Sequence, residues 1–95
     1  MPYGETPEYV YLDVPPVAEF RSCAGLVLAG MVTRARIGVG GLEDAVDVLE
    51  SLHSGEEVTR YRFSLAQDGV VAEIEDPGSH EAEAATWRTV VELVA

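Results

Sequence analysis

The segment at residues 40–55, GGLEDAVDVLESLHSG, constrains the fold of this chain most strongly. Its buried stripe follows the i, i+3, i+4, i+7 spacing of an amphipathic helix and consists of Leu42, Ala45, Val46, Leu49, Leu52 and His53. The acidic residues Glu43, Asp47 and Glu50 fall outside this stripe. Acidic residues in the first turn complement the positive end of the helix dipole, and Gly55 is placed for a left-handed C-terminal cap. The segment is therefore predicted to be a helix with an acidic outer face.

Regular elements are predicted on both sides of this helix. Residues 9–14 alternate between apolar and polar and predict a half-buried strand that ends at Pro15. Residues 17–35 carry a broad apolar face at helical spacing. Residues 56–65 alternate again, and Asp68-Gly69 is a strong hairpin signal. A two-residue loop there would pair Phe63 with Ile74 and Arg62 with Glu75.

The C-terminal segment is predicted to be a third helix. It opens at Ser79, and its apolar positions match a buried helical face at Ala84, Trp87, Val91 and Val94. The predicted order is β-α-α-β-β-α, which indicates an α+β sandwich with helices on one face of a mainly antiparallel three-stranded sheet. Residues 1–95 are expected to form a single domain, with residues 1–7 as an irregular lead-in.

The amino-acid composition of the chain disfavours several classes of function. The net charge of −11 disfavours binding to nucleic acid, and it favours either a basic partner or simply solubility. There is no lysine, which excludes a P-loop and a Schiff base, and there is no asparagine. No apolar run is long enough to cross a membrane, no export signal is present, and Cys23 is the single cysteine. A cytoplasmic protein with no membrane contact is expected.

Several short motifs, in their order and spacing, resemble one bacterial family. These motifs follow one another in the same order as motifs of the anti-sigma-factor serine kinases, a branch of the GHKL ATPase superfamily with a histidine-kinase-like ATPase fold. They are Val14-Pro15, Leu42-Glu43-Asp44 and Asp76-Pro77-Gly78-Ser79. The resemblance spans nearly the whole chain. It implies a truncated GHKL-like fold and a role in transcription regulation, with Asp76 and Gly78 at the position of the family's adenine-binding motif.

The chain departs from this family where ATP and Mg²⁺ would bind. The family holds Mg²⁺ with an asparagine four residues after a catalytic glutamate, and this chain contains no asparagine. The glycine-rich second box and the lid of the family are also missing. Glu43 and Asp47 have the i, i+4 spacing, but a solvated acidic helix face explains them better than a metal site does. Neither a catalytic residue nor a metal site is therefore expected, and Asp76 and Gly78 are interpreted as vestiges of a cofactor site.

The sequence thus predicts a degenerate, non-catalytic relative of the anti-sigma factors that acts by protein–protein interaction. Expected partners are a second copy in a homodimer, a sigma factor or an anti-anti-sigma protein. The acidic residues Glu43, Asp47 and Glu50 are the candidate partner-binding surface. Two alternatives remain open, namely a nucleotide-binding serine kinase that still uses Glu43, Asp47 and Asp76, and a small-ligand binding domain.

Overall fold

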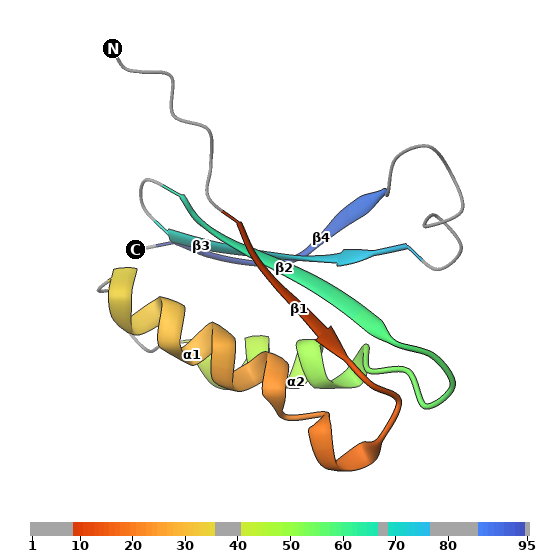
Figure 1. Ribbon diagram of the computed structural model, residues 1–95. Coiled ribbons are helices and arrows are strands. Elements are labelled where there is room, and N and C mark those ends of the chain that lie inside the picture. Colours follow the sequence, from red (N-terminus) through yellow and green to blue (C-terminus); the bar gives the residue numbers. More distant parts are fainter. Residues whose placement is uncertain (1–8, 36–40, 67–68, 77–85, 95) are drawn as a thin grey trace.

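The computed structural model describes residues 9–35, 41–66, 69–76 and 86–94. These residues form an α+β fold in which two helices lie on one face of a four-stranded antiparallel sheet (Figure 1). The strands lie in chain order and are β1 (Tyr9–Val14), β2 (Thr59–Ala66), β3 (Gly69–Glu75) and β4 (Trp87–Val94). The helices are a short 3-10 turn η1 (Ala18–Phe20), α1 (Cys23–Ala35) and α2 (Leu42–Ser51). The α+β class is confirmed, whereas the prediction of three strands is wrong.

The predicted strand at residues 9–14 and the central helix are both confirmed. Helix α2 begins after Gly41, which has a φ of 87° and therefore occupies the left-handed region that favours glycine. At its other end the C-cap is Leu52 in a right-handed conformation, so the predicted left-handed cap at Gly55 is wrong. The predicted helix at residues 17–35 is divided into η1 and α1.

The β2–β3 hairpin is present, but its register differs from the prediction by two residues. Ala66 pairs with Gly69, and Phe63 pairs with Ala72 rather than with Ile74. A two-residue shift leaves every side chain on its predicted face. Gly69 lies inside the ladder, where β4 passes very close to it. A Cβ at this position would overlap the carbonyl oxygen of Leu93. This glycine is therefore required for the close approach of two strands rather than for the turn.

The C-terminal segment forms strand β4, so the predicted helix over residues 87–94 is wrong. The part of that prediction at residues 79–85 lies outside the described residues. A β-bulge opposite Ala72 and Glu73 inserts Val90 into the pairing with β3. Because a bulge interrupts the alternation of a strand, the apolar residues of β4 follow no simple period of two and happen to match a helical stripe. Val91 in fact faces the helices, whereas Trp87 and Val94 lie on the opposite face.

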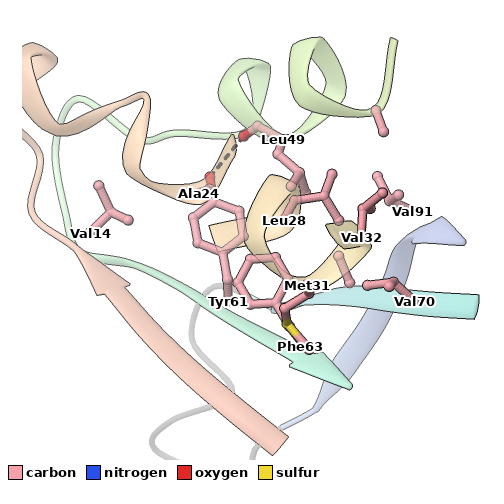
Figure 2. Close-up of a cluster of buried hydrophobic side chains, with 12 residues drawn as sticks. Val14, Ala24, Leu28, Met31, Val32, Leu49, Tyr61, Phe63, Val70 and Val91 are labelled. Atoms are coloured by element: carbon pink, nitrogen blue, oxygen red, sulfur yellow. Dashed lines mark hydrogen bonds between the residues drawn. The ribbon is translucent and has the colours of Figure 1, made fainter. Parts of the chain in front are cut away.

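The core lies between the sheet and the helices (Figure 2). Tyr61 and Phe63 of β2 are fully buried and stacked, with 6.2 Å between their ring centroids. They pack with Leu28 of α1 and Leu49 of α2, which are also fully buried. The Tyr61 hydroxyl donates a hydrogen bond of 2.8 Å to the Leu49 carbonyl oxygen, so this buried polar group is satisfied.

Two glycines of α1 differ in their surroundings. A Cβ on Gly25 would lie 2.8 Å from Cγ1 of Val46, so this glycine allows α1 and α2 to pack closely. Gly30 has no neighbour within 4 Å of the same position, so its lack of a side chain brings no packing benefit. In the described part of the chain, neither helix has the length and apolar character needed to cross a membrane.

Candidate functional site

The three acidic residues predicted to bind a partner lie on α2 and differ in exposure. Glu43 and Asp47 are exposed, one helical turn apart. Glu50 is half-buried, and its charge contributes to the raised pKa of Tyr61. Glu43 and Asp47 therefore face solvent, whereas Glu50 lies closer to the core.

Asp76, the predicted vestige of an adenine site, follows the last residue of β3. Its backbone N–H donates a hydrogen bond of 2.9 Å to the carbonyl oxygen of Thr86, and its carboxylate lies 4.0 Å from the Arg88 guanidinium. Gly78, the second residue of that prediction, lies outside the described residues.

A pocket of about 260 Å³ lies beside Asp76. It is bordered by the segment that leads from α2 into β2 and by the end of β3, and its lining includes Ser54, Glu57, Arg60, Glu75 and Asp76. The lining contains three carboxylates and one guanidinium group, so its net charge is negative and opposes the binding of a phosphate group. The pocket suits a small neutral or cationic ligand better than a nucleotide.

The most distinctive surface is the sheet face opposite the helices, which we call the open face. No described element covers it (Figure 1). The strand registers place on this face Tyr9, Tyr11 and Asp13 of β1, Arg60 and Arg62 of β2, Glu73 and Glu75 of β3, and Trp87 and Glu92 of β4. Aromatic and charged side chains from all four strands therefore gather on one surface.

An ion pair between the two central strands lies in the middle of the open face. Arg62 Nε and Nη2 donate hydrogen bonds of 2.7 and 3.2 Å to the two carboxylate oxygens of Glu73. Only 19% of the Arg62 side chain and 14% of the Glu73 side chain are exposed. The hydrogen bonds to Glu73 raise the pKa of Arg62 above its ordinary value, although burial acts in the opposite sense. This bidentate geometry fixes the guanidinium group in one orientation.

Three aromatic rings surround this ion pair, and we call Tyr9, Tyr11 and Trp87 the aromatic cluster. The Arg62 guanidinium carbon lies 4.3 Å from the centre of the Tyr9 ring and 4.7 Å from that of the Trp87 ring. Tyr11 lies 6.0 Å from both Tyr9 and Trp87, measured between ring centroids. These distances are typical of cation–π and aromatic contacts. The rings thus bridge β1 and β4, which are not neighbours in the sheet.

A second string of charges lies beside the aromatic cluster. Arg60 lies between Asp13 and Glu75, at 3.8 and 4.0 Å from their carboxylate oxygens. Because Arg60 and Asp13 are about half exposed, their pair contributes little to stability and remains accessible to solvent, whereas only 8% of the Glu75 side chain is exposed.

Sequence reasoning missed the aromatic cluster because Trp87 was assigned to the buried face of a helix. One signal was present in β1, where Tyr9 and Tyr11 occupy alternate positions on the polar side of the strand. His53 lies 2.8 Å from the Pro15 carbonyl oxygen through Nε2 and ties the end of α2 to the residues after β1, whereas His80 lies outside the described residues.

No protein-family model, curated protein or solved structure matches the chain. Among the described residues, no group of three or more His, Cys, Asp or Glu side chains is placed to hold a metal ion. The described residues form a small α+β sandwich with one open sheet face. The resemblance to the anti-sigma-factor kinases remains a prediction from the sequence motifs.

Proposed function

We propose that this protein is a non-catalytic regulatory protein that acts by binding another protein. The observation that carries this proposal is the open face, where tyrosine, tryptophan and arginine side chains are held together beside solvent. These three residue types are enriched among the residues that dominate binding energy at protein interfaces. A pre-ordered surface also loses less side-chain entropy when a partner binds.

The resemblance of the sequence motifs suggests which regulatory role this is. A shortened relative of the anti-sigma-factor kinases would act in the cytoplasm on a sigma factor or an anti-anti-sigma protein, or as a homodimer. It would need neither ATP nor Mg²⁺. The exposed carboxylates of Glu43 and Asp47 on α2 offer a second contact surface for a basic partner.

The proposal is tested by affinity capture from an extract of the source organism. The immobilised protein is compared with a Tyr11→Ser variant, and with a Glu43→Gln/Asp47→Asn variant that alters only the exposed side of α2. We expect a protein retained in stoichiometric amount by the wild type and lost from one of the two variants. Retention of no protein, together with a monomeric mass by light scattering, would refute the proposal.

A second candidate function is supported by the pocket beside Asp76. A small-ligand binding protein would use this pocket, and its ligand would stabilise the native state in proportion to the logarithm of its concentration. A residual nucleotide site would have to bind phosphate against the charge of the pocket lining. Thermal unfolding in the presence of Mg²⁺-ATP or Mg²⁺-ADP tests the nucleotide. A saturable rise in Tm that is absent in Asp76→Ala would favour this candidate over the first.

A further inference from the structure

The aromatic cluster, rather than the ion pair beneath it, is what the open face presents to solvent. Tyr11 is 61% exposed, whereas the side chains of Arg62 and Glu73 are each less than one-fifth exposed. Arg62 already occupies one side of the Tyr9 and Trp87 rings. A partner therefore meets the rings first, and the negative faces of aromatic rings attract cations.

Charge on the open face also favours a cationic partner. Among the described residues on this face, the carboxylates are Asp13, Glu73, Glu75 and Glu92, and the only guanidinium groups are Arg60 and Arg62. The face therefore carries an excess of negative charge, in a chain whose net charge is −11. A second copy would bring the same excess toward the face, whereas a basic segment would be attracted to it.

We propose that the open face recognises a basic segment of a partner protein, with Arg or Lys side chains stacked on the outward surfaces of Tyr11 and Trp87. The carboxylates of Asp13 and Glu92 supply the complementary charge. This inference rests on the proposed function and specifies its surface and the chemistry of its partner. Arginine is favoured over lysine because its planar guanidinium group stacks on an aromatic ring and is less strongly hydrated.

The side chains of the aromatic cluster are held in fixed orientations, which suits the binding of a basic segment. The two hydrogen bonds to Glu73 fix Arg62, and Arg62 in turn holds the Tyr9 and Trp87 rings. Tyr11 contacts both of these rings. The rings are therefore positioned before a partner arrives, which reduces the entropy lost on binding.

The test is a titration of the purified protein with a capped peptide of alternating Arg and Gly, with a Glu-Gly peptide as the charge control. Trp87 is the single tryptophan, so its emission reports directly on the open face. The ionic strength is held at about 0.15 M to limit unspecific attraction between distant charges. We expect saturable binding of the basic peptide and none of the acidic peptide.

Two variants locate the binding site. Tyr11→Ser should weaken binding about fivefold through the loss of a stacked cation. Asp13→Asn, which removes an exposed charge together with its pairing to Arg60, should weaken it by about twofold. The Glu43→Gln/Asp47→Asn variant should bind like the wild type, and circular dichroism shows whether each variant is folded.

Three outcomes would overturn the inference. They are the absence of saturable binding, loss of binding only in the α2 variant, and self-association that Tyr11→Ser abolishes while the peptide has no effect. In each case a partner captured from the extract would still support the proposed function. Absence of any captured partner, with peptide binding intact, would instead count against the proposed function alone.

Discussion

Replacement of Tyr61 by phenylalanine should reduce the loss in free energy of unfolding that the protein undergoes as the pH becomes alkaline. Burial of the Tyr61 phenol, with a smaller contribution from the charge of Glu50, raises its pKa from 10.0 to about 12. The neutral phenol also donates a hydrogen bond to the carbonyl oxygen of Leu49. That oxygen accepts a second hydrogen bond from the N–H of Leu52, so it keeps one partner in the variant.

The size of the change in stability follows from the lost hydrogen bond and from the raised pKa of Tyr61. At neutral pH the variant should be less stable by about 1 kcal/mol, because one hydrogen bond is lost without leaving the carbonyl unpaired. As the pH rises above 10.0, the unfolded chain releases the Tyr61 proton while the native state retains it. The wild type then loses about 1.4 kcal/mol by pH 11 and about 2.3 kcal/mol by pH 12. The variant has no phenol at this position and is spared that loss.

The assay is urea unfolding followed by far-UV circular dichroism, for both proteins, from neutral pH to about pH 11. We expect the difference in free energy of unfolding to shrink as the pH rises and to vanish at about pH 10.5–11, given a hydrogen bond of about 1 kcal/mol. A difference that stays constant over this range would refute the reasoning. It would mean that the Tyr61 phenol ionises as readily in the folded protein as in the unfolded chain.

Three further predictions concern the open face and the strands. Arg62→Met should destabilise the protein by about 1–3 kcal/mol in urea unfolding, because it leaves a covered carboxylate without its partner. Gly69→Ala should be destabilising in thermal unfolding, because its Cβ would overlap backbone atoms, whereas Gly30→Ala should be neutral or stabilising by up to about 1 kcal/mol. Val91→Lys should prevent stable folding, whereas Val94→Lys should change stability by less than about 0.5 kcal/mol, because Val94 is 66% exposed.

Each of these predictions has a result that would contradict it. Unchanged stability of Arg62→Met would mean that the ion pair makes no net contribution. Equal effects of alanine at Gly69 and at Gly30 would contradict the close packing of β3 and β4. Equal damage by lysine at Val91 and at Val94 is the result expected for the helix that the sequence suggested, and it would argue against strand β4.

Much of the fold could be predicted from the sequence because the hydrophobic pattern of a strand or helix lies within a short stretch of the chain. The alternation in Tyr9–Val14 and the helical stripe in Leu42–Ser51 each reflect one element with one buried face. The hairpin was found for the same reason. Its register includes Gly69 in the ladder, where β4 approaches closely, and such a long-range contact leaves no local signal in the sequence. Strand β4 was misassigned because its bulge imitates a helical spacing.

The candidate site was harder to predict because it is assembled from four strands. Arg62 was expected to lie opposite Glu75, and the two-residue shift places it opposite Glu73 instead. Trp87 could join the cluster only once β4 was known to be a strand. The acidic residues Glu43 and Asp47 were identified as exposed because a helical stripe also defines its opposite face.

The contact between Tyr11 and Trp87 has a consequence for the order in which the protein forms. The two rings belong to the first and last strands of the sheet, while the β2–β3 hairpin pairs residues close in sequence. Contacts between distant residues require the closure of long loops and form slowly, so the hairpin is expected to form early and the aromatic cluster late. During translation the cluster can exist only after the codons for β4 have been read. A nascent chain that is still missing this strand would therefore be unable to engage a partner through the open face.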